Sequence, residues 1–301
     1  MNSYLISVVG PTAIGKTSLS LKLAEHFNTK IISADSRQFY KEMKIGTAAP
    51  TPEELARIKH YFIHHKSIED NYNVGAFERD ALQCLKLLFK SHNVVIMVGG
   101  SGLYVDAVVK GLDDFPDVDP SIRKELNKEL KTTGIESLQQ QLKDLDEKTY
   151  QNIELENPHR IIRALEICIG SKKPYSSFLN QKKAKRPFQT ITIGLKAERD
   201  IIYHRINQRV DKMMEDGLLD EVKNLQQYQH LNALNTVGYK ELFNYLNGEW
   251  TLNFAVSEIK KNSRRFAKRQ LTWFRKDPSI LWFNYQNSFD KIINQLTTYS
   301  I

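Results

Sequence analysis

Short apolar runs recur along the chain, near residues 3–9, 30–34, 93–98, 190–195 and 280–284. Runs of this length between turn-forming residues are typical of strands that are buried on both faces. Helical patterns lie between them; residues 18–27, for example, place Leu19, Leu23 and Phe27 on one helical face. This alternation predicts an α/β fold with a mostly parallel sheet that is covered by helices.

The segment between the third and fourth apolar runs is too long for a single crossover. Turn-forming residues at 111–120 mark its beginning, a basic stretch at 182–187 marks its end, and helical patterns lie near 120–132, 135–143, 146–153 and 157–170. We therefore expect a helical insertion at residues 112–188 and a catalytic core built from residues 1–111 and 189–301. The sequence contains no internal repeat and no low-complexity tract.

The first apolar run leads into Gly10-Pro-Thr-Ala-Ile-Gly-Lys-Thr17, which matches the phosphate-binding pattern G-x-x-x-x-G-K-[ST] in the required strand–loop–helix setting. Backbone amides of this loop and of the following helix are expected to point at phosphate oxygens. Lys16 would add a point charge, and the Thr17 hydroxyl would bind a magnesium ion. The sequence thus predicts a phosphate site, but not whether the phosphate is hydrolysed, transferred or expelled.

A second acidic signature, common in nucleotide hydrolases, is missing from its usual place. The run Asn93-Val-Val-Ile-Met-Val-Gly-Gly100 ends in glycines instead of a carboxylate. The nearest acid in an equivalent position is Asp35, which follows a short apolar strand and should lie at the ligand-binding edge of the sheet. Asp35 would either hold magnesium or act as a general base.

Further motifs give the chain a specific resemblance. They are Ala34-Asp-Ser-Arg-Gln38 with Tyr40, Ile45-Gly-Thr47, Val98-Gly-Gly-Ser-Gly-Leu-Tyr104, Asn157-Pro-His-Arg-Ile-Ile-Arg-Ala-Leu-Glu166, Val237-Gly-Tyr-Lys240 and Arg264-Arg-Phe-Ala-Lys-Arg-Gln-Leu-Thr-Trp-Phe-Arg275. With the phosphate loop, they resemble the ordered motifs of tRNA dimethylallyltransferases over nearly the whole chain. Ser101 departs from the threonine expected in many members but keeps a hydroxyl, so we expect function to be retained.

The resemblance implies a P-loop NTPase-like core with basic C-terminal helices and an insertion that packs against a tRNA anticodon stem-loop. It also implies transfer of a dimethylallyl group from dimethylallyl diphosphate to N6 of adenosine 37, beside the anticodon, in tRNAs that read codons starting with U. The products would be N6-(dimethylallyl)adenosine and diphosphate. Mg²⁺ would be the cofactor. The loop motif also implies that the protein is of the nucleotide- and ATP-binding type.

Site roles follow from the same resemblance, residue by residue. The catalytic set would be Asp35, Lys16, Thr17, Ser101 and Arg209. Diphosphate would be bound by Gly10, Pro11, Thr12, Ala13, Ile14, Gly15, Lys16 and Thr17, with Thr17 as the metal ligand. Contacts to tRNA would come from Asp35, Ser36, Arg37, Gln38, Ser101, Arg123, His159, Arg160, Ile161, Ile162, Arg163, Val237, Gly238, Tyr239 and Lys240. The side chains proposed to stack on unpaired bases, or else to be structural, are Tyr40, Tyr104 and Tyr239.

Charge is distributed unevenly along the 301 residues, whose net charge is +8. Residues 257–278 hold eight basic and two acidic side chains, and residues 159–187 hold eight basic and one acidic, so the rest of the chain is net acidic. Such clustering suits a polyanion, although solvated helix faces would show it too. Phe266 and Trp273 interleave with the first stretch at helical spacing and are expected to belong to a core rather than to stack on bases.

Other features fit a cytoplasmic enzyme. No stretch approaches eighteen apolar residues, and the first strand begins too early to leave room for a signal peptide, so we expect no membrane association. Cys84 and Cys168 lie among apolar residues without metal-binding spacing and are expected to be buried and reduced. Nothing indicates a symmetric interface, so a monomer is expected.

Three alternatives stay open at this point. A small-molecule or nucleotide kinase would use the same loop for ATP and would not need the basic insertion. A non-catalytic RNA-binding P-loop module would leave Lys16 and Asp35 merely structural. An adenylate isopentenyltransferase would modify a free nucleotide, although the two basic stretches favour tRNA.

Overall fold

The computed structural model describes residues 3–179, 185–299 and 301. The chain forms two compact units, one made of residues 1–110 and 186–301 and the other of residues 111–185. Lys182 and Lys183, which contribute to one of the basic stretches, lie outside the described residues.

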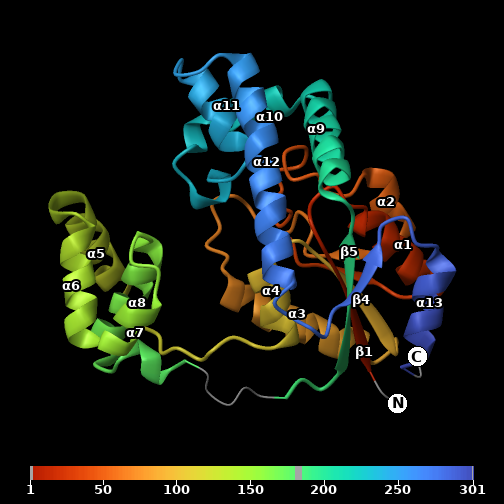
Figure 1. The fold of residues 1–301 in the computed structure, drawn as a ribbon, viewed down its shortest axis with the longest axis horizontal. Coiled ribbons are helices and arrows are strands. Elements are labelled where there is room, and N and C mark those ends of the chain that lie inside the picture. The colour runs from red at the N-terminus through yellow and green to blue at the C-terminus, as the bar shows by residue number, and fades with distance from the viewer. Residues whose placement is uncertain (1–2, 180–184, 300) are drawn as a thin grey trace. The chain divides into compact units, whose positions relative to one another are not determined.

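The first unit contains a six-stranded sheet with strand order β3-β2-β4-β1-β5-β6, in which all neighbours pair in parallel (Figure 1). Its strands are β1 (Tyr4–Val9), β2 (Ile31–Ser33), β3 (His60–Tyr61), β4 (Val94–Val98), β5 (Gln189–Lys196) and β6 (Leu281–Asn284). The predicted α/β fold and its five strands are confirmed. The sequence analysis missed β3, because two residues are too few to show a periodic pattern.

Side chains on the two faces of the sheet enter separate apolar clusters. Tyr4, Ile6 and Val8 of β1 pack on one face, while Leu5 and Val9 pack on the other. The helices of this unit before β5 are α1 (Lys16–His26), α2 (Pro52–Arg57), α3 (Val74–Leu88) and α4 (Gly102–Val109). Helix α1 covers the first face and helices α3 and α4 cover the second, which is why β4 is entirely apolar and β1 is apolar except for Ser7.

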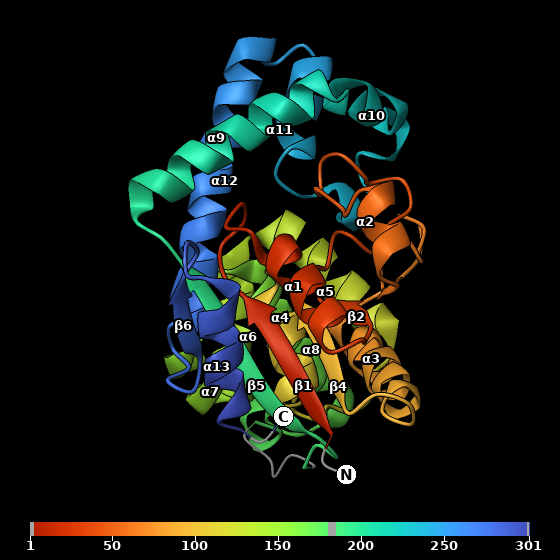
Figure 2. The ribbon, with the colours of Figure 1, turned by 90° about the vertical axis from the view of Figure 1, so that its right-hand side faces the viewer.

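After β5 the chain forms a helical layer beyond the carboxyl ends of the strands (Figure 2). It comprises α9 (Arg199–Glu215), α10 (Leu218–Asn224), η2 (Gln226–Tyr228), η3 (Asn232–Leu234), α11 (Tyr239–Leu246) and α12 (Leu252–Phe274); α13 (Phe289–Thr297) then returns to the face covered by α1. A separate core joins α10, α11 and the first half of α12 to Tyr40 and Met43, from the segment that follows β2. Helix α12 therefore runs from this core to the edge of the sheet.

The second unit is helical. It contains α5 (Pro120–Thr133), α6 (Ile135–Leu145), α7 (Glu147–Asn152), α8 (Pro158–Ser171) and η1 (Tyr175–Ser177). The four helices match the expected ranges to within two residues. Leu126, Leu138, Leu142 and Leu165 belong to its own apolar core.

Candidate active site

A cavity of about 1140 Å³ lies at the carboxyl ends of β1, β2 and β4. This edge is where open parallel sheets bind their ligands. Its lining includes the end of the phosphate loop, the turn after β2 that carries Asp35, and the glycine-rich turn after β4. Helices α9 and α12 contribute further lining residues.

The phosphate loop has the backbone conformation that its glycines permit. Gly10 and Gly15 have φ values of 141° and 107°, which side chains disfavour, and a Cβ on Gly10 would lie 2.7 Å from the Leu195 carbonyl oxygen. Lys16 Nζ donates to the Pro11 carbonyl at 2.8 Å, so the amine lies over the loop. Burial lowers the pKa of Lys16 to about 8; the negative charge of Asp35 opposes this shift and the positive charge of Arg209 adds to it.

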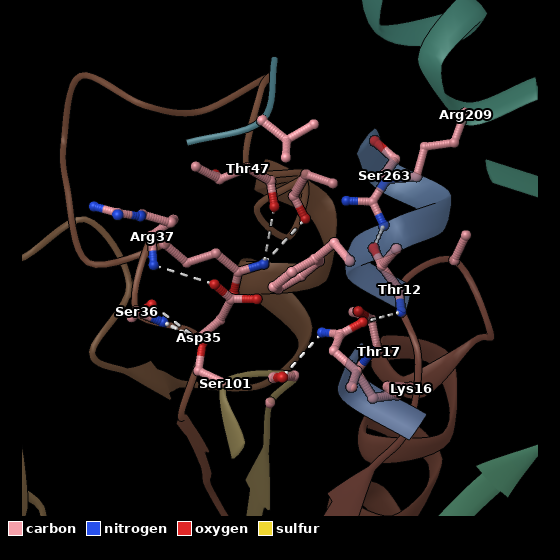
Figure 3. Close-up of a pocket in the computed structure, with 18 of the residues that line it drawn as sticks. Thr12, Lys16, Thr17, Asp35, Ser36, Arg37, Thr47, Ser101, Arg209 and Ser263 are labelled. Carbon is pink, nitrogen blue, oxygen red and sulfur yellow. Dashed lines mark hydrogen bonds between the residues drawn. The ribbon is translucent and has the colours of Figure 1, made fainter. Parts of the chain in front are cut away.

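Thr12 is held from two directions. Arg209 Nη1 donates to Thr12 Oγ1 at 2.8 Å, and the Thr12 amide donates to Gln270 Oε1 at 2.8 Å (Figure 3). In addition, Arg205 Nε donates to the Ala13 carbonyl at 2.7 Å. The loop is thus anchored to α9 by two guanidinium groups and to α12 by an amide.

Asp35 lies across the cavity on the turn after β2. Its Oδ1 accepts from the Arg37 amide at 3.1 Å, which fixes the carboxylate orientation. Ser101 Oγ accepts from the Ser36 amide at 3.1 Å and lies 3.1 Å from Ser36 Oγ. Through these contacts of Ser101, the turn after β4 supports the turn that carries the acid.

Gln38 and Arg37 connect the same turn to more distant loops. Gln38 Nε2 donates to the Thr47 and Ala48 carbonyls at 3.4 and 3.2 Å, and its Oε1 accepts from Ser33. Arg37 donates to the carbonyls of the turn before α11, namely Asn232, Ala233 and Asn235. Both side chains already have protein partners, although both line the cavity.

Glu221 anchors the loop that contains Thr47. Its carboxylate accepts from the amides of Lys44, Ile45 and Gly46 at 2.8–3.0 Å and from the Tyr239 hydroxyl at 2.6 Å. A Cβ on Gly46 would lie 2.5 Å from the Tyr239 ring, so only glycine allows this approach. Burial, and then the Glu221 charge, raise the pKa of the Tyr239 hydroxyl and keep it a donor.

These contacts correct several expectations. Tyr239 is fully buried and Tyr40 is 6% exposed, so neither ring can stack on a base. Tyr104 is half-buried and lines the cavity, as do Val237, Gly238 and Lys240. Phe266 and Trp273 are 37% and 39% exposed at the cavity, so their assignment to a core was wrong. The core positions of that helix face are Gln270 and Phe274.

In the second unit, the predicted tRNA contacts divide into two sets. Ile161 and Ile162 are buried in its apolar core, which contradicts a direct contact for their side chains. His159 and Arg160 are exposed at the start of α8, where Arg160 lies 3.7 Å from Glu154. Arg123 and Arg163 both pair with the buried carboxylate of Glu166 while remaining about half exposed. Glu166 therefore holds two exposed guanidinium groups side by side.

Gln270, Arg205 and Glu221 are site residues that the sequence reasoning missed. Gln270 had a detectable signal, because a polar side chain at helical spacing between aromatic residues, when buried, must have a polar partner. It is 5% exposed, and its Nε2 donates to the Gly100 carbonyl at 2.9 Å. Glu221 and Arg205 had no such signal, since surface helices commonly carry these residues.

The oxygen groups at this site suit a magnesium ion whose coordination shell is completed by substrate oxygens. Thr17 and Asp35 line one cavity and offer a hydroxyl and a carboxylate. Mg²⁺ is usually held by one or two carboxylates together with waters and substrate phosphates. Within the described ranges, no group of three or more His, Cys, Asp or Glu side chains could hold a metal. The residues fit an ion shared with a diphosphate rather than a protein cage.

Two further expectations concern the cysteines and membranes. Cys168 is buried, but Cys84 is only half-buried, which corrects one part of the expectation; both are free thiols. Burial raises the pKa of each thiol, so neither is an activated nucleophile. Among the helices that the structure describes, none is both long and apolar enough to cross a membrane.

The parallel sheet, the glycine loop before α1 and the acid at the same edge define an α/β protein of the P-loop type. A family model described as IPP transferase matches residues 38–277. The tRNA dimethylallyltransferases of Christiangramia forsetii and Flavobacterium johnsoniae are 60% and 56% identical to this chain, covering 99% and 97% of it and 100% and 97% of their own lengths. The chain belongs to the IPP transferase family.

A solved structure gives the same assignment. The crystal structure of the full-length tRNA isopentenylpyrophosphate transferase from Bacillus halodurans is 37% identical, with a TM-score of 0.73. It covers 99% of this chain, and the match spans 95% of that structure. The likeness therefore includes both units of the chain.

Proposed function

We propose that the protein is a tRNA dimethylallyltransferase, which moves the dimethylallyl group of dimethylallyl diphosphate to N6 of adenosine 37. The substrates would be tRNAs that read codons starting with U, and the products would be N6-(dimethylallyl)adenosine and diphosphate. Membership of the family and the names of the full-length relatives support this activity. The observation that carries it is one cavity lined by both the phosphate loop and Asp35.

In the proposed reaction, the bond between the allylic C1 and the diphosphate oxygen breaks as N6 forms a bond to C1. Negative charge then grows on the diphosphate, and Lys16, Arg209 and the loop amides would stabilise it. Arg209 contacts the phosphate loop by donating a hydrogen bond to Thr12. A guanidinium can also bind phosphate in a bidentate manner. Bound Mg²⁺ would supply further charge stabilisation of the leaving group, with Thr17 as its protein ligand.

Asp35 is the proposed general base. The adenine N6 lone pair is delocalised into the ring, so the amine is a weak nucleophile. As N6 attacks C1, its protons become acidic. A carboxylate oriented by the Arg37 amide can accept one of those protons. Ser101 would keep this turn in place through Ser36.

Recognition of tRNA is proposed to use both units. At the cavity, the candidates are Ser36, Arg37, Gln38, Val237, Gly238 and Lys240. In the insertion at residues 112–188, Arg123, Arg163, His159 and Arg160 carry exposed polar groups that suit an anticodon stem-loop. An unpaired loop lowers the cost of extruding the target base. We further propose a cytoplasmic monomer, since the substrate is tRNA and a single chain supplies the cavity residues.

The test is a transfer assay with magnesium, an unmodified tRNA transcript and dimethylallyl diphosphate labelled in the allyl group. A transcript with guanosine at position 37 is the matched control, and labelled ATP is used in parallel. Label on adenosine 37 alone supports the proposal. Phosphoryl transfer from ATP without allyl transfer would instead support a kinase.

A further inference from the structure

Three exposed apolar side chains gather at one cavity. Leu103, Phe266 and Trp273 are 46%, 37% and 39% exposed, and all three line the active-site cavity. Eight large hydrophobic side chains are exposed in the described part of the chain, and the other five do not line this cavity. We call Phe266 and Trp273, together with Leu103, the aromatic rim. Apolar surface concentrated at a polar cavity marks a binding surface.

Trp273 is held in a fixed orientation. Its Nε1 donates to Asp106 Oδ2 at 2.8 Å, and Asp106 is in turn paired with Lys110 at 2.9 Å. A Cβ on Gly102 would lie 2.3 Å from Trp273 Cδ1, so the indole packs directly on the backbone of that turn. One side of the ring is covered and its polar edge is satisfied, while a large part stays exposed.

A cation lies on the Phe266 side of the rim, whereas the Asp106 carboxylate accepts from the indole on the Trp273 side. The Arg269 guanidinium lies 5.7 Å from the centre of the Phe266 ring and also lines the cavity. Gln270, on the same face of α12 between Phe266 and Trp273, contacts the phosphate loop through Thr12. The rim therefore favours a ligand that combines a flat apolar face with negative charge on the Arg269 side, and such a ligand would lie next to the phosphate loop.

An unpaired nucleotide meets these requirements. Its base offers a π face and its backbone offers a phosphate, and proteins that bind single-stranded nucleic acid combine aromatic platforms with basic grooves. We propose that the aromatic rim is a stacking platform on which Trp273 holds one unpaired base of the tRNA anticodon loop, close to the target adenosine. This inference rests on the proposed function.

The first experiment measures equilibrium binding of an anticodon stem-loop RNA without the allyl donor, so that chemistry does not contribute. Base–aromatic stacking of about 1–3 kcal/mol per base corresponds to roughly 5- to 150-fold in affinity. Trp273→Ala should weaken binding by about tenfold or more, whereas Trp273→Phe should stay within about threefold of the wild type. Phe254→Ala is the matched control, because Phe254 is also an exposed aromatic residue of α12, at 48%, but does not line the cavity.

The second experiment identifies the base. Stem-loops with an abasic residue at each loop position in turn are bound to the wild type and to Trp273→Ala. At one position the base and the indole should be coupled, so that losing both costs no more than losing either. Trp273→Leu, which keeps apolar bulk, serves if the alanine variant fails to fold, and it should still lose affinity.

Equal binding by the wild type, Trp273→Ala and Trp273→Leu would overturn the platform. The same penalty from every abasic position in the wild type and in Trp273→Ala would also overturn it. A raised KM for dimethylallyl diphosphate with unchanged RNA affinity would also overturn it, because the indole would then contact the allyl chain. Failure of the proposed function has a different signature, which is the absence of allyl transfer by the wild type. The RNA-binding measurements do not depend on that transfer.

Discussion

Gln270 joins Thr12 of the phosphate loop to the turn after β4: its Oε1 accepts from the Thr12 amide at 2.8 Å while its Nε2 donates to the Gly100 carbonyl at 2.9 Å. A Cβ on Gly100 would lie 2.2 Å from that Nε2, so a larger residue there would displace the Gln270 amide. The amide therefore sets the distance between the leaving-group site and the turn that supports Asp35 through Ser101.

Gln270→Leu should lower kcat/KM for the allyl donor by about tenfold and destabilise the fold by about 1–3 kcal/mol, because it leaves the buried Gly100 carbonyl and the part-buried Thr12 amide without this partner. Steady-state kinetics and thermal unfolding measure the two effects. Gln286→Leu, at an exposed position outside the cavity, is the control. Unchanged donor kinetics with a stable fold would show that Gln270 does not position the loop.

Asp35→Asn keeps the shape of the side chain but removes its basicity. If Asp35 accepts the N6 proton, kcat should fall by roughly 10²- to 10⁴-fold while tRNA affinity stays nearly the same. Single-turnover rates and RNA binding give both numbers. Normal turnover by this variant would remove Asp35 from the mechanism.

Lys16 predicts a pH dependence. Burial lowers the pKa of this amine to about 8, so the free enzyme loses its positive charge as the pH rises through about 8. A neutral amine binds diphosphate less well, so kcat/KM for the donor should decline above that pH. Lys16→Arg should remove the decline, since arginine stays protonated, even if its activity is lower. An identical profile for both proteins would contradict the assignment.

A basic surface on α9 and α12 predicts salt-dependent binding. Arg199, Arg264, Arg265 and Lys268 gather beside Tyr203, whereas Lys260 pairs with Asp211 at 2.6 Å. Replacing Arg265 and Lys268 together by alanine should weaken tRNA binding and reduce the slope of log K against log salt by roughly 1–2. Lys22→Ala, an exposed change on α1, should leave the slope unchanged. An unchanged slope in the double variant would make this surface a bystander.

Glu221 links two loops through one carboxylate. Glu221→Gln weakens the acceptor for three backbone amides and the Tyr239 hydroxyl, so the protein should lose about 1–3 kcal/mol of stability in denaturant unfolding. Because that loop supplies the acceptors of Gln38, the KM for tRNA should rise as well. Asp220→Asn, at the exposed neighbour, is the control; equal stability of the two variants would contradict the anchoring role.

The sheet of the first unit and the helices of the second were predictable, because their apolar positions follow strand and helix patterns over enough residues. Periodicity also placed Phe266, Gln270, Trp273 and Phe274 on one face of α12, but it could not show that the first three of these residues line a cavity. The exposed aromatics and the buried glutamine depend on what packs opposite them, which is set by β1, β4 and α4, far away in sequence.

The local motifs indicated some site residues and misplaced others. The loop pattern indicated Lys16 and Thr17 because a phosphate-binding turn is built from adjacent residues. Tyr239 lies in a motif that resembles a tRNA contact, yet its ring fills the space left by Gly46 and its hydroxyl binds Glu221. Sequence proximity to exposed residues therefore did not reveal which side of the turn each side chain occupies.

The most direct test of the central claim is the identity of the nucleoside that the enzyme makes. Unmodified tRNA treated with the protein, magnesium and dimethylallyl diphosphate is digested to nucleosides and analysed by chromatography and mass spectrometry. The account predicts N6-(dimethylallyl)adenosine from position 37, and its loss with Asp35→Asn. Unmodified adenosine at position 37 after treatment with folded protein would show that the chain does not catalyse this transfer.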